Sequence, residues 1–258
     1  MNLDAVIIVL REVLEAAVLG SLLMALSHRR QLGQRWFWMA ILLGMLGAWA
    51  YASAIGPISE LWDYTGQEMV NATMQGLIFL GFLVLLVNLR GVHEQSRVTT
   101  LTMGAIITLA LIRELSEILL YLQGYMADPA ASMGVFAGAA VGAITGSSVG
   151  IALYVLTFWA VDWARAEKAI LVTLIVVIAG VITQAVSLLL QVDRLPHLSP
   201  LWDSDHLISE RSIVGQLLYA LMGYESTPTA WHIGMYVAAL GIMLTLMRTR
   251  TQLATHAS

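Results

Sequence analysis

The sequence contains no cysteine, which excludes disulfide bonds, thiolate metal sites and cysteine nucleophiles. Charged residues are also scarce, at 12% of the 258 residues against about 25% in a typical soluble domain. The formal net charge of −4 is small and gives no indication of a nucleic acid partner. Hydrophobic residues make up 59% of the chain, and the mean hydropathy is +0.78. These features predict an all-α polytopic membrane protein.

Long apolar stretches predict seven transmembrane helices, because about 20 residues are needed to cross a ~30 Å hydrocarbon layer. They cover approximately Leu3–Leu26, Trp36–Ile55, Met69–Leu89, Leu101–Leu122, Met133–Val161, Ala169–Val192 and Trp231–Met247. The first stretch lacks a basic start and a small-residue cleavage site, so we expect a retained span and not a signal peptide. Residues 193–230 form the longest loop. Within it, the apolar spacing of Ile208–Met222 predicts a short helix at the outer membrane surface.

Lys and Arg are distributed unevenly between the two sides of these spans. Nine of the 13 lie in the first, third and fifth loops and the C-terminal tail, whereas the opposite side holds only Arg194 and Arg211. Since cytoplasmic loops carry the excess of basic residues, this predicts the N-terminus outside and the C-terminus in the cytoplasm.

Two charged motifs of the form Arg-Glu-x-x-Glu interrupt the first and fourth spans. Their charged members are Arg11, Glu12 and Glu15, and Arg113, Glu114 and Glu117. Each charge near the centre of a spanning helix costs roughly 2.5–3.5 kcal/mol, so six unpaired charges would cost on the order of 15 kcal/mol. Helix packing alone does not account for that cost, and we interpret the motifs as a site that handles a charged species.

The two motifs also indicate an internal repeat. They lie 102 residues apart, and the same offset carries the second span into the fifth and the third into the sixth. The two copies cover residues 1–90 and 99–192, and the helix at 231–247 follows them. Because each copy has an odd number of spans, the two copies must have opposite orientations in the membrane. Inverted repeats place substrate sites near the membrane midplane where the units meet.

Successive helical residues are turned by about 100°, so the three charges of each motif share one helix face. Two such helices facing each other would gather four carboxylates and two guanidiniums. Carboxylates are hard ligands suited to Mg, Ca, Mn and oxidised iron. We therefore predict a metal site formed by Glu12, Glu15, Glu114 and Glu117. Arg11 and Arg113 are expected to pair with these glutamates when no ion is bound. The alternative is that the charges only lock helices together, as in a membrane scaffold or sensor.

Two further patterns lie outside the motifs. The outer loops carry acidic residues that can raise the local concentration of cations, which are Glu60, Asp63, Glu68, Asp203, Asp205 and Glu210. In the fifth span, glycine recurs at every fourth residue from Gly134 to Gly150 and forms a stripe along one helix face. We interpret the stripe mainly as intramolecular helix packing, with a dimer seam or a substrate-path wall as alternatives.

With these motifs on the first and fourth of seven helices, the chain resembles the oxidase-dependent ferric-iron permeases, which include the fungal high-affinity iron permease and bacterial EfeU-type permeases. The usual family motif is Arg-Glu-Gly-Leu-Glu; here Val13 and Leu115 replace the glycine and Ser116 replaces one leucine, while every charged position is kept. The resemblance implies a non-enzymatic permease for ferric iron in the cell membrane, expected to be a bacterial cytoplasmic membrane. It also implies a separate extracytoplasmic oxidase or peroxidase and iron-delivery proteins, with iron as cargo and not as a permanently bound cofactor.

Other functions stay open at the level of sequence. One is a permease for another cation, such as ferrous iron, lead or manganese. Another is a proton-coupled carrier of an organic solute that uses the glutamates as a proton relay. Assembly into a homo-oligomer also stays open.

Overall fold

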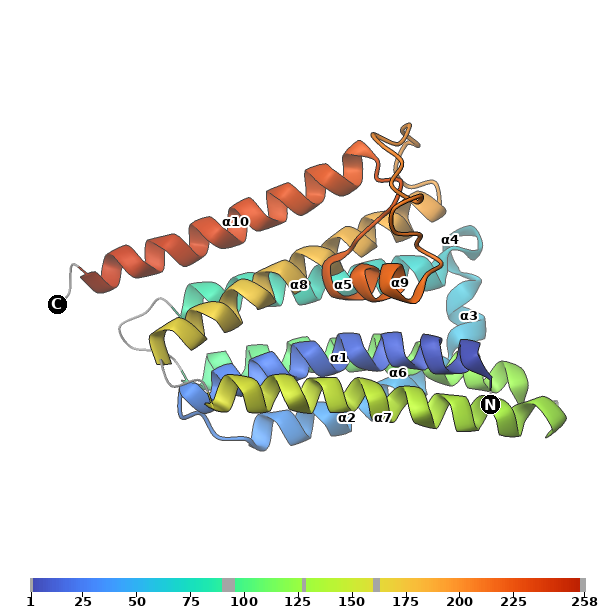
Figure 1. Cartoon of the computed structure of the whole chain (residues 1–258), viewed down its shortest axis with the longest axis horizontal. Coiled ribbons are helices and arrows are strands. Elements are labelled where there is room, and N and C mark those ends of the chain that lie inside the picture. The colour runs from blue at the N-terminus through green and yellow to red at the C-terminus, as the bar shows by residue number, and fades with distance from the viewer. Residues whose placement is uncertain (1, 90–95, 127–128, 160–162, 256–258) are drawn as a thin grey trace.

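The computed structural model describes residues 2–89, 96–126, 129–159 and 163–255, and these residues form helices and connecting loops (Figure 1). The helices are α1 (Leu3–Arg29), α2 (Arg35–Ser53), α3 (Ile55–Ser59), α4 (Leu61–Tyr64), α5 (Gly66–Asn88), α6 (Ser96–Tyr125), α7 (Pro129–Trp159), α8 (Trp163–Gln191), α9 (Ile213–Met222) and α10 (Ala230–Thr255). The predicted all-α class is confirmed. The end of the fifth span, predicted at Val161, lies outside the described residues.

Five helices are long and apolar enough to cross a membrane: α2, α5, α7, α8 and α10. Helices α1 and α6 are longer than α2, at 27 and 30 residues, but each carries a charged motif that lowers its hydropathy. The seven-span count, the inverted repeat and the orientation in the membrane therefore stay predictions.

The long helices pack in pairs that are distant in sequence. Helix α1 lies mainly along α7, α6 lies mainly along α2, and α5 lies against both α6 and α8. Helix α10 covers α8 (Figure 1). The large side chains that are fully buried where these helices meet include Leu23, Phe82, Met103, Ile107 and Leu174.

The two ends of the helix bundle differ in charge. Glu60, Asp63, Asp203 and Asp205 lie at the end where α1 begins, which we call the acidic end. The opposite end, where α1 stops, holds the arginines and lysine of the first and fifth loops; we call it the basic end. There Arg30 Nη2 lies 2.6 Å from Glu167 Oε1 at the start of α8.

The glycine stripe of α7 packs against α1, as the intramolecular interpretation predicted. A Cβ atom on Gly138 would lie 2.5 Å from Asn2 O, and one on Gly142 would lie 2.5 Å from Val6 O. At Gly150 the Cβ would lie 2.8 Å from the Ala17 Cβ. Real Cβ atoms do not come this close to other atoms, so glycine allows the α1 backbone to lie directly on α7. The stripe thereby fixes the helix that carries the first charged motif.

The short helix predicted within Ile208–Met222 is present as α9, and its position at the outer membrane surface stays a prediction. It packs between α8 and α1 (Figure 1). Its C-terminus contacts α8 at Gly180, where a Cβ would lie 2.6 Å from Met222 C. Gly180 is 11 residues before Gln191 at the end of α8, or about 16 Å along that helix. The left-handed Gly223, with φ 66°, ends α9 and allows this close approach.

Candidate functional site

The two charged motifs face each other on antiparallel helices. Arg113 of α6 contacts Glu15 of α1, and Arg11 of α1 approaches Glu117 of α6. In both pairs the residue numbers add to 128, which is the constant register of two antiparallel helices. The contacts are thus the same interaction made twice, once by each motif.

Arg113 is the centre of the ion-pair network. Its Nη1 atom lies 2.7 Å from Glu114 Oε1 and 3.1 Å from Glu15 Oε2, and its Nε atom lies 3.7 Å from Glu117 Oε1. Its side chain is only 8% exposed. Arg11 is 30% exposed, pairs closely with Glu12, and approaches Glu117 Oε2 at 3.9 Å. The two arginines therefore have different roles: Arg113 is buried and pairs with Glu15 and Glu114, whereas Arg11 is partly exposed and pairs with Glu12.

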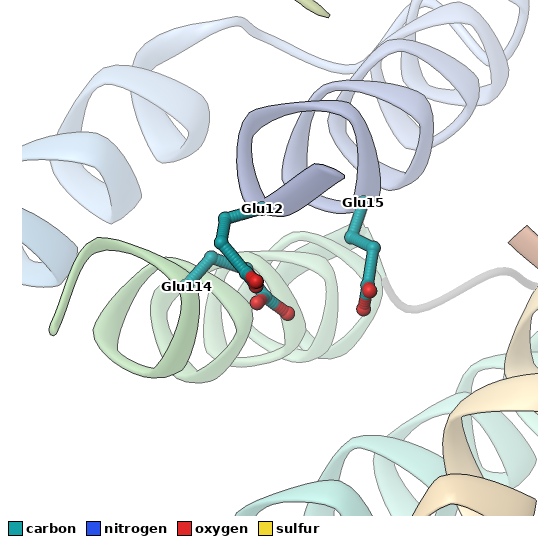
Figure 2. A group of neighbouring side chains, drawn as sticks. All are labelled: Glu12, Glu15 and Glu114. Carbon is teal, nitrogen blue, oxygen red and sulfur yellow. The ribbon is translucent and has the colours of Figure 1, made fainter. Parts of the chain in front are cut away.

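Three carboxylates form the buried part of the site, namely those of Glu12, Glu15 and Glu114. Each residue offers one carboxylate oxygen, and these three oxygens lie within 4.8 Å of one another. They can therefore serve as ligands to a single ion. Figure 2 shows the three side chains extending from α1 and α6 into a common space. In each, one oxygen pairs with an arginine. The other oxygen has no hydrogen-bond partner among the described residues. A buried, unpaired carboxylate oxygen is costly, and a cation bound among the three carboxylates would lower that cost.

Glu117, the fourth predicted ligand, lies apart from these three. Its side chain is 27% exposed, and Asn71 Nδ2 donates to its Oε1 over 3.5 Å. The Tyr51 hydroxyl donates to Asn71 Oδ1 at 3.2 Å and so fixes the direction of that amide. Glu117 thus faces the acidic end.

A polar cavity of about 320 Å³ reaches Glu117 from the acidic end, and Glu68 and Asn71 also line it. A second cavity of about 410 Å³ reaches Arg11 and is lined by Tyr219, Glu210 and Glu225, among others. Both motifs are therefore accessible from the same end of the bundle.

The six acidic residues predicted to collect ions divide into two groups. Glu68 and Glu210 line the two cavities. Glu60, Asp63, Asp203 and Asp205 are exposed. Asp203 and Asp205 also accept backbone hydrogen bonds within their own loop, from Asp205 N at 2.9 Å and Glu210 N at 3.3 Å. Their collecting role stays a prediction.

Glu225 and His232 were not predicted, and both line the cavity at Arg11. Burial, together with the neighbouring Glu210, raises the pKa of Glu225 to about 7. His232 Nδ1 accepts from Thr229 N at 3.1 Å, so Nε2 carries the proton and donates to Ser187 Oγ at 3.1 Å. Both ring nitrogens are therefore occupied by the protein.

Asn71 was not predicted as a site residue, although its sequence context contains a signal. Asn71 and Gln75 are amide residues four apart inside an apolar span, and polar groups at that depth mark functional positions. Glu225 and Tyr219 carry no comparable signal, because they belong to the long loop and to α9, and only tertiary packing brings them to the site.

Towards the basic end the surroundings of the site become apolar. A cavity of about 700 Å³ extends from Glu12 and Glu114 between α1, α2, α6 and α7, and its other lining includes Met24, Phe37 and Ile107. The carboxylates thus lie between polar cavities on one side and an apolar region on the other.

Comparison with known families gives one result. The iron permease FTR1 family model matches residues 2–253, nearly the whole chain. No curated protein and no solved structure matches the chain. Members of this family are permeases and not enzymes, so the resemblance stated from the two motifs is confirmed. The protein is a multi-pass membrane protein, and it belongs to the iron permease FTR1 family.

Proposed function

We propose that the protein carries ferric iron into the cell through the buried site made by its two Arg-Glu-x-x-Glu motifs. The observation that carries this proposal is the set of three unpaired oxygens on Glu12, Glu15 and Glu114. The hardness of a carboxylate-only ligand set favours Fe³⁺ over softer ions. The site also lies deep in the helix bundle, as a transport site requires.

The path begins at the acidic end. The ion enters the cavity lined by Glu68 and Glu117, and the charge of both residues attracts it. Glu117 then passes it to the three buried carboxylates. Arg113, which pairs with Glu15 and Glu114 in the absence of an ion, is displaced from at least one of these partners as the ion arrives.

The packing of the helices supports two inverted repeats. Under the predicted repeat, the first helices are α1 and α6 and the second helices are α2 and α7. Helix α1 packs on α7, and α6 packs on α2, so the first helix of each unit contacts the second helix of the other unit. Exchanging the two units also turns the Arg11–Glu117 pair into the Arg113–Glu15 pair. Such an architecture alternates access by moving one unit against the other. Because the proposal has the acidic end facing outward, a state with polar cavities at that end is an outward-facing one.

In this proposal the chain has seven spans in a bacterial cytoplasmic membrane. Its N-terminus is outside, so the acidic end, where α1 begins, faces the outside of the cell. An extracytoplasmic oxidase or peroxidase and iron-delivery proteins would present ferric iron at that end. The gathering of basic residues at the opposite end supports the orientation.

Uptake into proteoliposomes tests the function. Glu→Gln at each of positions 12, 15, 114 and 117 keeps size but removes a charge, and each variant is measured for folded protein in the membrane and for iron uptake. We expect folded protein with strongly reduced uptake. Wild-type uptake per folded molecule by all four variants would contradict the proposal.

Competition identifies the cargo. Uptake of labelled Fe³⁺ is measured against excess Fe²⁺, Pb²⁺ or Mn²⁺, and we expect unlabelled Fe³⁺ to compete best. Stronger competition by a divalent ion would instead identify that ion as the cargo. Uptake of no metal, with binding of an organic solute, would favour a proton-coupled carrier.

The lack of cysteine allows a direct test of orientation. Ser199→Cys at the acidic end and Gly33→Cys at the basic end each introduce a single exposed thiol. A membrane-impermeant maleimide should label Ser199→Cys in intact cells, and Gly33→Cys only after permeabilisation. The reverse pattern would invert the transport direction.

A further inference from the structure

Two buried glutamines lie on α5 and α8, and none of the steps above uses them. Gln75 of α5 is 0% exposed and Gln184 of α8 is 1% exposed. Gln75 Nε2 donates to Gln184 Oε1 at 3.0 Å, and Gln184 Nε2 donates to the Tyr219 carbonyl of α9 at 3.1 Å. A chain of hydrogen bonds thus joins three helices.

The direction of this chain is fixed at one end. The Tyr219 carbonyl can only accept, so Gln184 must direct its amino group towards α9 and its oxygen towards Gln75. Gln75 must then direct its amino group towards Gln184. The Gln75 Oε1 atom is left over, and within the described part of the chain it has no hydrogen-bond partner. Native proteins rarely leave a buried acceptor unpaired, so such an atom requires an explanation.

The register of α5 against α6 shows the depth at which Gln75 lies. Asn71 contacts Glu117, Gly81 packs against Ile106, and Asn88 donates to Thr99. In each pair the two residue numbers add to 187 or 188. The same register places Gln75 level with Arg113, on the face of α5 that also carries Asn71.

Arg113 has a complementary gap. Its Nε donor makes no hydrogen bond among the described residues, although Glu117 lies 3.7 Å away. An unpaired acceptor and an unpaired donor therefore lie at the same depth on neighbouring helices. Beyond them towards the basic end, the buried core of α5 and α8 is largely apolar and includes Ile78, Phe82 and Ile178. Gln75 and Gln184 are the last polar pair before that apolar region.

We propose that the Gln75 side-chain oxygen is a further ligand for the transported cation, which it contacts after the three carboxylates. Amide oxygens are hard, uncharged ligands. Such a ligand holds a cation less tightly than a carboxylate does, which suits a step in which the ion must leave the site. The inference rests on the proposed function, because it assumes that Glu12, Glu15 and Glu114 bind the ion first.

The test is uptake of Fe³⁺, supplied as its citrate complex, by proteoliposomes containing the full chain. Gln75→Met keeps the length and approximate volume of the side chain but removes both polar atoms. We expect its maximal rate to fall about tenfold with KM changed less than about twofold, because the lost contact is made after capture. Gln184→Met, which frees the Gln75 amide, should change the rate in the same direction but by less.

Two further variants separate a ligand from a packing role. Gln75→Glu keeps an oxygen at the position and should recover at least part of the rate lost in Gln75→Met. Thr73→Val is the matched control, since Thr73 is exposed on the same helix and its hydroxyl bonds only to Met69 O of α5. It should transport at the wild-type rate.

Two results would overturn the inference: a wild-type maximal rate for Gln75→Met per folded molecule, or an equally low rate for Gln75→Met and Gln75→Glu. Measuring Glu15→Gln in parallel separates this failure from failure of the proposed function. Loss of uptake by Glu15→Gln with normal uptake by Gln75→Met refutes only the role of Gln75. Normal uptake by Glu15→Gln refutes the proposed function itself.

Discussion

The Nη1 atom of Arg113 on α6 lies 3.1 Å from Oε2 of Glu15 on α1, and this contact joins the two charged motifs. Its counterpart between Arg11 and Glu117 is longer, at 3.9 Å, and more exposed. Two motifs with the same sequence pattern therefore occupy different environments. This asymmetry leads to the first prediction.

Arg113→Ala should destabilise the protein far more than Arg11→Ala. Removing Arg113 leaves Glu15 and Glu114 buried without their cation, at a cost of about 3–5 kcal/mol. Removing Arg11 leaves one buried carboxylate, that of Glu12, without its paired cation, and because Arg11 is 30% exposed, solvent offsets part of this loss. Thermal unfolding of each purified variant, followed by fluorescence in detergent, provides the measurement. Equal losses of stability would show that the two arginines are equivalent in the folded protein.

Gly142→Ala should prevent normal assembly of α1 on α7. The added Cβ would lie 2.5 Å from the Val6 carbonyl, and the backbone of α1 cannot move away without disturbing the site. Gly76→Ala is the control, since a Cβ there meets no atom within 4 Å. The control should be as stable as the wild type or up to about 1 kcal/mol more stable, because alanine favours helix.

The measurement for this pair is the yield of monodisperse protein after extraction from the membrane. Normal yield and normal iron uptake by Gly142→Ala would contradict the close α1–α7 contact.

Glu68→Gln should raise the KM for iron, whereas Asp63→Asn should not. Glu68 lines the cavity that reaches Glu117, but Asp63 is exposed and does not line it. Each substitution removes one charge from the same end of the protein, so the pair separates a local effect from general attraction. Initial uptake rates over a range of iron concentrations give both constants. A similar KM change in both variants would favour long-range attraction by the whole acidic end.

Glu225→Gln should stabilise the protein at neutral and higher pH. The folded pKa of Glu225 is about 7, above its ordinary value of 4.5, so the folded state binds more protons than the unfolded state between these values. Wild-type stability therefore decreases as pH rises across this window, whereas the variant lacks this contribution. The difference in Tm should be near zero below pH 4.5, grow up to about pH 7, and then stay constant. A difference that is independent of pH would show that Glu225 titrates normally.

Much of the site could be predicted from the sequence because charge is costly in an apolar helix. Arg11, Glu12 and Glu15 stand out only because the residues around them are apolar, and the 102-residue offset to Arg113 repeats the signal. The spacing of four residues likewise identified the α7 glycines as a packing stripe, because helical periodicity alone places them on one face.

Tertiary structure alone decided how the two motifs differ. The sequence treats Glu15 and Glu117 as equivalent, yet Glu15 is buried against Arg113 and Glu117 faces a polar cavity beside Asn71. The physical reason is α9, which enters between α1 and α8, while α5 packs directly on α6. A ten-residue amphipathic segment is compatible with the membrane surface as well as with packing between helices. The contact between Gly180 and Gly223, where neither residue has a side chain, and the hydrogen bond from Gln184 to the Tyr219 carbonyl hold α9 against α8.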